Sequence, residues 1–327
     1  MLAWRVHDLG EPREVLRLDD VDDIEPGPGQ LLVQVRASSA NFPDVLMCRG
    51  QYQVRPELPF TPGIEVCGEV VGVGDGVTGF AVGDRVIGSP DLPNGAFAER
   101  TLMAAERTFP APESLDDAEA AAFYIGYQTG WFGLHRRAAL QPGETLLVQA
   151  AAGGVGSAAV QLGKAAGAKV IGVVGGPDKM KVATELGADV VVDRHAEDFV
   201  AVVKEATDGR GADVVYDPVG GEAYARSTKC IAFEGRILVV GFASGTVPTP
   251  GLNHALIKNY SIVGLHWGLY NQKDPAAIRE CHAELTRLAN DGVLRPLVSE
   301  RIALDQVGDA VQRLADGRTT GRVAFVA

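Results

Sequence analysis

A turn of small residues at positions 150–156 has the composition needed to hold a pyrophosphate. The apolar strand Leu146–Gln149 runs directly into this turn, and a helix from Ser157 to Ala166 follows it. Small side chains there allow a tight bend, a close approach of the backbone to phosphates, and close packing of the helix on the strand. The sequence therefore predicts a dinucleotide-binding turn between a strand and a helix.

This turn departs from the pattern GxGxxG only in its first position, where Ala151 replaces glycine. The backbone N–H groups of Gly154 and Val155, next to Gly153, would point at the phosphates from the helix N-terminus. The alternative is a glycine-rich turn that only packs a helix against a sheet. The place of the turn, at the start of a long alternation of strands and helices, favours phosphate binding.

The second strand of this alternation bears on which nicotinamide dinucleotide would bind. An NAD site usually carries Asp or Glu about 20 residues after the glycines, where it holds the ribose 2′-hydroxyl. Here the strand ends in Gly175 and another glycine, Lys179 lies just beyond it, and Arg194 follows the third strand. Two cations could bind a 2′-phosphate, so we expect NADPH. Asp178 is the opposing observation, although an acid suits the first turn of a helix, and both cations could instead be ordinary surface charges.

Strands and helices alternate regularly from residue 145 onward. The strands are short, β-branched and nearly continuous in apolar residues, as is typical of strands buried on both faces of a parallel sheet. Glycine follows three of the helices, as expected at a helix C-terminus. This alternation predicts a doubly wound α/β sheet. The expected strands are Thr145–Gln149, Lys169–Val174, Val190–Val192, Val214–Tyr216, Arg236–Val240 and Ser261–Leu265, and the expected helices are Val155–Ala166, Pro177–Leu186, Ala196–Ala206 and Glu222–Lys229.

The first part of the chain, about 110 residues, has short strands separated by Gly/Pro turns, which predicts a compact β domain. A helix is expected to start near Ser114, to be interrupted around Tyr124–Thr129 and to end at Ala139. The tail, residues 266–327, holds two expected helices, Pro275–Ala289 and Leu304–Ala315. It is too small for a third domain, so we expect it to pack on the first one.

Composition narrows the classes of function. The chain of 327 residues has 42 acidic and 30 basic side chains and a net charge of −12, which argues against nucleic acid or an anionic membrane as the main partner. Its four cysteines are far apart and form no CxxC pair, which favours reduced thiols. The N-terminus has no apolar signal region, and no apolar run approaches the roughly 20 residues of a membrane span. We expect a cytoplasmic protein of two domains.

Several stretches together resemble the medium-chain dehydrogenase/reductase superfamily, and within it the zinc-independent quinone oxidoreductases related to zeta-crystallin. The matching stretches are residues 40–44, 62–65, 82–86, 150–156, 216–220 and 258–264. The resemblance implies a GroES-like β-rich catalytic domain, residues 1–122 and 266–327, around a Rossmann NADPH-binding domain, residues 123–265. It also implies homodimers joined at the edge of the Rossmann sheet, through the strand Ser261–Leu265.

The resemblance also bears on metal binding. Alcohol dehydrogenases of this superfamily hold a catalytic zinc ion through Cys and His, and this chain has Asn41 and Ile64 at those positions. An amide and an aliphatic side chain cannot replace thiolate and imidazole ligands. The segment Gly88–Gly95 also lacks the cysteines of a structural zinc loop. We expect no metal.

Further site residues follow from the resemblance alone. It implies that Asn41 and Tyr52 line the acceptor pocket, where an amide or a phenol could hydrogen-bond a developing oxyanion. Asn41 could alternatively cap a turn. The resemblance places Thr129 near the cofactor phosphate and implies a contact of Arg318 with the 2′-phosphate, although Arg318 also fits an ordinary exposed turn. Backbone regions near the nicotinamide amide are implied at Gly241, Phe242, Leu265 and Trp267.

These expectations converge on hydride transfer from NADPH to a small quinone or other conjugated carbonyl, without a metal. The first alternative is an enoyl-thioester reductase, for which Tyr52, Tyr124 and Tyr127 are candidate proton donors. The second alternative is a non-catalytic NADPH-binding protein that serves as a redox sensor or structural protein.

Overall fold

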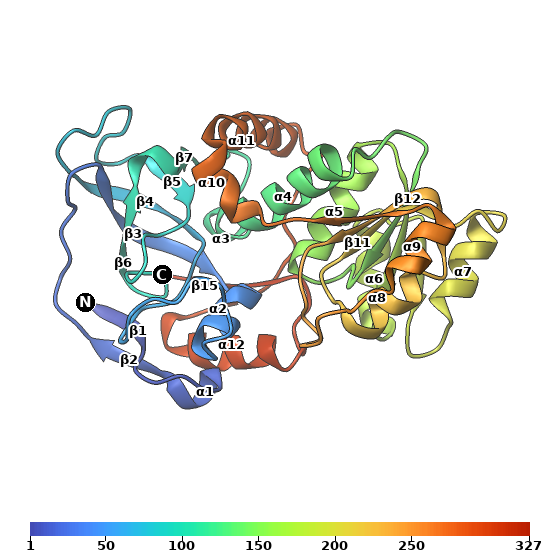
Figure 1. The fold of residues 1–327 in the computed structure, drawn as a ribbon. Helices are drawn as coiled ribbons and strands as arrows, with labels where there is room; N and C mark the ends of the chain where they lie inside the picture. The colour runs from blue at the N-terminus through green and yellow to red at the C-terminus, as the bar shows by residue number, and fades with distance from the viewer. The chain divides into compact units, whose positions relative to one another are not determined.

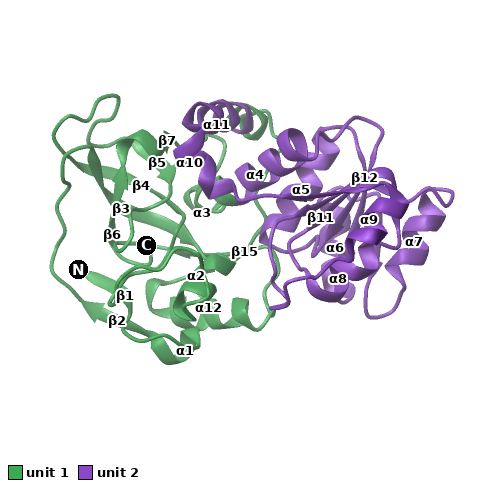
Figure 2. Ribbon diagram, in the orientation of Figure 1, with its two compact units in different colours: residues 1–125, 286–327 green, residues 126–285 purple.

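The computed structural model describes residues 1–327 and divides into two compact units. One unit comprises residues 1–125 and 286–327, and the other comprises residues 126–285 (Figure 2). The sequence placed the boundaries after residues 122 and 265. The second boundary lies later because the segment after residue 265 packs within the second unit. There the ring centroids of Phe132 and Tyr270 are 4.3 Å apart, and Arg136 pairs with Asp274 at 2.7 Å.

The first unit is built on a mostly antiparallel sheet with the strand order β14-β15-β3-β4-β5-β7, in which β6 also pairs with β3. A separate hairpin is formed by β1 and β2. The last strand of the chain, β15, pairs with β3, so both ends of the sequence build this sheet. The strands are β1 Leu2–Val6, β2 Leu16–Asp20, β3 Gln30–Ser39, β4 Val66–Val73, β5 Arg85–Gly88, β6 Arg100–Ala104, β7 Thr108–Pro110, β14 Val298–Ile302 and β15 Arg322–Val326, and the helices are α1 Pro12–Val15, α2 Phe42–Cys48, α3 Asp117–Ala121 and α12 Val307–Ala315.

The second unit is a six-stranded parallel sheet with the order β10-β9-β8-β11-β12-β13. Figure 1 labels two of its strands, β11 and β12, among the helices of this unit. Its strands are β8 Thr145–Gln149, β9 Lys169–Val174, β10 Val190–Asp193, β11 Ala212–Asp217, β12 Ile231–Val239 and β13 Ser261–Gly264. Its helices are α4 Tyr124–Trp131, which begins just before the boundary, α5 Gly154–Ala165, α6 Pro177–Glu185, α7 Phe199–Ala206, α8 Gly221–Ser227, α9 Leu252–Lys258 and α10 Tyr270–Lys273. A π-helical turn, Phe132–Arg137, follows α4, and α11 Pro275–Asn290 contains the second boundary.

Helices cover both faces of the parallel sheet. On one face, Leu147 of β8 shares a core cluster with Phe199 and Val203 of α7. On the other face, α5 approaches β8 so closely that a Cβ on Gly163 would lie 2.5 Å from a methyl carbon of Leu146. The expected class, a GroES-like β-rich domain with a doubly wound parallel-sheet domain, is confirmed.

One predicted detail is corrected. The expected interruption at Tyr124–Thr129 is α4, and the chain breaks earlier, at residues 122–123. Gly130 of α4 allows this helix to pack closely on α5, because a Cβ on Gly130 would lie 2.6 Å from a methyl carbon of Leu162. The short helices α1, α2, α9 and α10 were not predicted.

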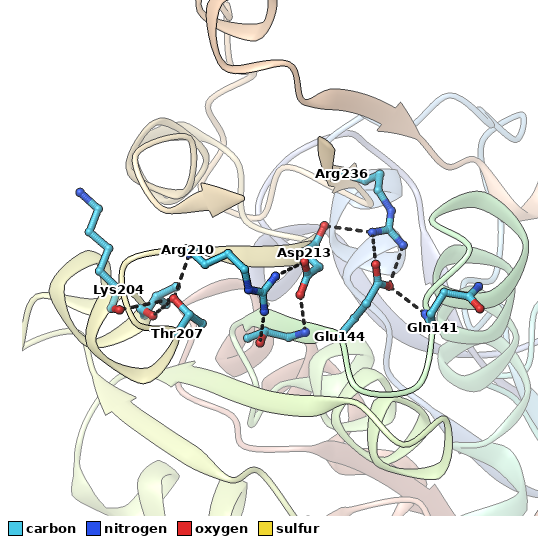
Figure 3. Close-up of polar contacts among 10 residues, drawn as sticks. Gln141, Glu144, Lys204, Thr207, Arg210, Asp213 and Arg236 are labelled. Carbon is cyan, nitrogen blue, oxygen red and sulfur yellow. Dashed lines mark hydrogen bonds and ion pairs between the residues drawn. The ribbon is translucent and has the colours of Figure 1, made fainter. Parts of the chain in front are cut away.

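A polar network ties together the amino ends of the parallel strands (Figure 3). Arg236 of β12 donates to both carboxylate oxygens of Glu144, at 2.7 and 2.9 Å, and Nη1 also donates to the backbone oxygen of Asp213. The Asp213 carboxylate in turn accepts from the backbone N–H of Thr145 at 2.7 Å and pairs with Arg210.

No helix in the structure is both long enough and apolar enough to cross a bilayer.

Candidate active site

The carboxyl ends of the parallel strands lie along one edge of the sheet, and most of the predicted cofactor residues follow these ends. The strand order reverses between β8 and β11, because β9 and β10 extend the sheet on one side and β11 to β13 on the other. Ligands of open parallel sheets bind in the crevice outside the carboxyl ends at such a reversal. The turn after β8, predicted to bind phosphate, lies at this point.

The turn after β8 has the backbone geometry of a close approach. Ala150 has a positive φ of 53°, and Gly153 is the N-cap of α5, which starts at Gly154. A Cβ on Gly156 would lie 2.1 Å from the Ala150 carbonyl oxygen, so only glycine fits there. With twelve residues, α5 presents its first N–H groups and the positive end of its dipole at this turn, which fits a pyrophosphate.

Helix α4 lies against the same turn. A Cβ built on Gly126 would lie 3.6 Å from the backbone oxygen of Gly154, and Gly130 packs on α5. Thr129, which the resemblance placed near the phosphate, lies between these two glycines on α4 and is buried. Thr129 therefore belongs to the segment of α4 that packs on α5.

Gly175, Lys179 and Arg194 gather at the ends of β9 and β10. The guanidinium of Arg194 lies so close to Gly175 that a Cβ there would be 2.8 Å from Cζ and Nη1. Burial and the nearby charge of Arg194 lower the pKa of Lys179. Two cations held near each other at the tip of the second strand form a site suited to a phosphate dianion.

The turns after β11, β12 and β13 complete this edge. The backbone of Ala243 donates to the carbonyl of Pro218 at 3.0 Å, so the turn after β12, which holds Gly241 and Phe242, is hydrogen-bonded to the turn after β11. Leu265 continues β13 by donating to the carbonyl of Val239 at 3.0 Å. Trp267 Nε1 donates to Oε1 of Gln128 on α4 at 3.2 Å.

The predicted acceptor residues lie in the first unit. Asn41 is the N-cap of α2, and its backbone N–H donates to Asp44 at 2.8 Å in a capping interaction. Its side chain is buried, and the amide Nδ2 donates to the carbonyl of Ser39 at 3.0 Å and to Glu65 Oε2 at 2.9 Å. Both amide hydrogens are therefore used within the chain.

Arg322, the first residue of β15, fixes the other side of the Asn41 amide. Its Nη1 donates to Asn41 Oδ1 at 2.8 Å, its Nε donates to the Ser39 hydroxyl at 2.9 Å, and its Nη2 pairs with Glu65. Glu65 is fully buried and also accepts from the backbone N–H of Ile125 at 2.7 Å. This ion pair, held by additional hydrogen bonds, gives the Asn41 amide one orientation.

Tyr52 is half-buried and packs against the hydrophobic core of the first unit. Burial and the neighbouring Asp44 raise the pKa of its phenol. Asp44 is itself fully buried, accepts from the backbone N–H groups of Asn41 and Gly63, and has a pKa raised by burial to about 7. Tyr52 thus remains a neutral hydrogen-bond donor at neutral pH.

Sequence reasoning missed the partners of Asn41. Glu65 stands in one of the stretches that carry the resemblance, but nothing local links it to Arg322, 257 residues away. Arg318, a predicted cofactor contact, lies in the first unit in an exposed turn, with 74% of its side chain accessible, and is 3.8 Å from Asp316. No group of three or more His, Cys, Asp or Glu side chains is arranged to hold a metal ion.

Comparison with known proteins gives a consistent picture. The alcohol dehydrogenase GroES-like domain matches residues 27–113, and the zinc-binding dehydrogenase family model matches residues 154–283. A protein of Nematostella vectensis named quinone oxidoreductase-like protein 2 homolog is 41% identical over 325 residues, which cover 99% of this chain and 88% of that protein.

Solved structures are similar to this chain over its full length. A probable oxidoreductase from Mycobacterium abscessus is 39% identical, with a TM-score of 0.90, and the match covers 100% of this chain and 99% of that one. The Escherichia coli quinone oxidoreductase complexed with NADPH is 30% identical, with a TM-score of 0.93 and complete coverage of both chains.

The two domain matches and the paired β-rich and parallel-sheet units place the chain in the medium-chain dehydrogenase/reductase superfamily, a class of oxidoreductases. Within that superfamily, the chain belongs to the quinone oxidoreductase family, as its full-length relatives show.

Proposed function

We propose that the protein is an NADPH-dependent oxidoreductase that reduces a quinone or another conjugated carbonyl compound without a metal. The observation that carries this proposal is the pair of cations, Lys179 and Arg194, at the tip of β9, where an NAD site would carry an acid. The related Escherichia coli quinone oxidoreductase, crystallised with NADPH, supports the same cofactor.

Each part of the carboxyl edge has a proposed task in holding NADPH, which supplies a hydride when bound. Gly153, Gly154 and Val155 would hold the pyrophosphate at the start of α5, with Thr129 beside it. Gly175, Lys179 and Arg194 would bind the 2′-phosphate. We further assign a 2′-phosphate contact to Arg318 and contacts near the nicotinamide amide to Gly241, Phe242, Leu265 and Trp267.

Reduction of a quinone or enone places negative charge on an oxygen, and a hydrogen-bond donor at that oxygen lowers the barrier. We assign Asn41 and Tyr52 to the acceptor. Because both amide hydrogens of Asn41 are already used, Tyr52 is the better candidate for the direct donor, and Asn41 would have to release Ser39 or Glu65 to donate. Positions 41 and 64, where related alcohol dehydrogenases carry zinc ligands, hold Asn and Ile, which supports chemistry without zinc.

The test is a steady-state screen of NADPH oxidation with 1,4-benzoquinone, an enone and a trans-enoyl-CoA, with and without a chelator. We expect quinone turnover that the chelator leaves unchanged and that falls when NADH replaces NADPH. Faster turnover of trans-enoyl-CoA would assign an enoyl-thioester reductase instead. Tight NADPH binding without turnover of any acceptor would identify a binding protein and contradict an enzymatic role.

We also propose a homodimer joined at the edge of the parallel sheet. Strand β13 pairs with β12 alone, so its other edge carries backbone groups without a strand partner. On the preceding helix, α9, the side chains of Leu252, Leu256 and Ile257 are 74%, 76% and 71% exposed. Large exposed apolar groups on the helix that leads into an edge strand support an interface between copies. Light scattering on the purified chain would measure its mass.

Finally, we propose a cytoplasmic location. All four cysteines are free and buried, and burial raises the pKa of Cys48 and Cys67 to about 12, so these thiols are unreactive packing groups. Fractionation of cells that express the protein would test the location, and recovery in a secreted or membrane fraction would contradict it.

A further inference from the structure

Asp193, the last residue of β10, lies between the two turns that carry the predicted cations. A single carboxylate oxygen, Oδ1, accepts from the backbone N–H of Gly176 at 2.9 Å and from the backbone N–H of His195 at 3.0 Å. Gly176 belongs to the turn between β9 and α6, and His195 belongs to the turn after β10. Both turns therefore donate a hydrogen bond to the same carboxylate oxygen of Asp193.

Each turn places one cation. Gly176 is the N-cap of α6, and Lys179 is the third residue of that helix. The position of Gly176 therefore sets the place from which the Lys179 side chain extends. Arg194 stands between Asp193 and His195, and its backbone N–H donates to the carbonyl of Val174 at 2.9 Å. The orientation of its guanidinium toward Gly175 thus depends on a backbone held at both ends.

Asp193 is held as an ionised acceptor by the two backbone N–H groups. The N–H groups of Gly176 and His195 lower its pKa, which means that they stabilise the ionised form. Asp193 is largely buried, with 8% of the residue exposed. Its negative charge is hydrogen-bonded to the two turns, while the guanidinium of Arg194 lies beside Gly175 at the tip of β9.

We propose that Asp193 is a positioning residue for cofactor selection: by holding Gly176 and His195 it aligns Lys179 and Arg194 on one 2′-phosphate. This inference rests on the proposed use of NADPH. It goes beyond that proposal because Asp193 would act through the geometry of the two turns and not as a phosphate ligand itself.

Equilibrium binding of cofactor fragments tests this proposal without any acceptor. Dissociation constants would be measured by calorimetry for 2′,5′-ADP and 5′-AMP, and for NADPH and NADH, on the full chain. For D193A we expect about a tenfold weaker affinity for 2′,5′-ADP and NADPH and less than a twofold change for 5′-AMP and NADH, because only the phosphate contacts lose their alignment. D193N keeps an Oδ1 acceptor and should retain most of the selectivity.

Asp189, which immediately precedes β10, provides a matched control. Its carboxylate also accepts from a backbone N–H, that of Val170 at 2.7 Å, and pairs with Lys164 at 2.7 Å. D189A should lower the melting temperature but leave the ratio of the two fragment affinities unchanged. R194Q, which removes a proposed phosphate ligand, should abolish the preference for 2′,5′-ADP.

The outcomes separate the two proposals. If the wild-type chain does not prefer 2′,5′-ADP over 5′-AMP, the NADPH proposal fails, and this inference fails with it. If the wild type prefers 2′,5′-ADP but D193A weakens both fragments equally, or weakens neither, Asp193 has only a structural role and the inference alone is overturned.

Discussion

At the scale of single residues, the buried charges of the first unit explain why Asn41 has a fixed orientation. An amide can be rotated by half a turn at little cost when its neighbours accept either end. Here Arg322 offers only donors to Oδ1, and Glu65 and the Ser39 carbonyl offer only acceptors to Nδ2. The Asn41 amide is therefore held in one orientation, and Arg322 is one of the residues that hold it.

Replacing Arg322 with Ala should therefore be strongly destabilising. The change leaves the fully buried Glu65 carboxylate without its cation, which typically costs about 3–5 kcal/mol. Urea denaturation would measure the loss. The double variant E65Q/R322A, which removes both charges, should recover part of the stability. R313A is a control, because the Arg313–Glu300 pair is 36% exposed on each side and should contribute less than about 1 kcal/mol. A loss no larger than that of R313A would contradict this account.

The lowered pKa of Lys179 predicts a pH dependence that only NADPH binding should have. A bound 2′-phosphate stabilises the ammonium and raises its pKa, so between the free and bound pKa values binding takes up a proton. Affinity for NADPH should then fall with rising pH by up to about tenfold per pH unit, and affinity for NADH should not. Fluorescence titrations from neutral to alkaline pH would measure both. K179M should remove the difference in slope, and its persistence in K179M would refute the assignment.

At the scale of the elements, the two edges of the parallel sheet have different tasks: we assign cofactor binding to one edge and stabilisation of the fold to the other. The turns for the cofactor lie at the carboxyl ends of the strands, whereas Arg236, Glu144 and Asp213 connect the amino ends (Figure 3). Substitutions at the amino edge should change the free energy of unfolding and leave the affinity for NADPH unchanged.

R236A tests this separation. Loss of a half-buried, bidentate partner of Glu144 should cost about 1–3 kcal/mol. Although burial opposes ionisation of Glu144, its hydrogen bonds to Arg236 and to the Gln141 N–H hold its pKa below the usual value. The native state therefore binds fewer protons, so this stability is present above the unfolded-state pKa and is lost as the pH falls through the lowered one. Unfolding curves at neutral and acidic pH, with the exposed R287A as control, would check both statements. A large change in NADPH affinity for R236A would contradict the separation.

Elements marked by local signals could be predicted from the sequence. Helix α6 begins at Pro177 and ends before Gly187, as expected, because proline fixes the first turn and a glycine with a φ of 100° ends the helix. Helix α9 has no such pattern, since its apolar residues are largely exposed rather than aligned on a buried face. The Arg322–Glu65 pair could not be predicted either, because its partners meet only after β15 has joined β3.

At the scale of the whole molecule, the exposed apolar residues of α9 are the main support for the proposed dimer. Each of these three side chains would contribute about 1.5–3 kcal/mol to the free energy of association if it were fully buried. Together they would make a large contribution to the stability of a dimer. Strand β13, which follows α9 in the chain, has an open edge that a second β13 could pair with. Both features belong to the second unit.

A charge on α9 should dissociate this dimer. L256E would bury an unpaired carboxylate in the interface, and the dimer should weaken by at least about a hundredfold, because such a change commonly costs several kcal/mol. Analytical ultracentrifugation over a range of concentrations would measure the dissociation constant. V82E is the matched control, because Val82 is 66% exposed and lies in the first unit, so the variant should remain dimeric. A monomeric wild-type chain, or equal effects of L256E and V82E, would show that α9 is not the interface.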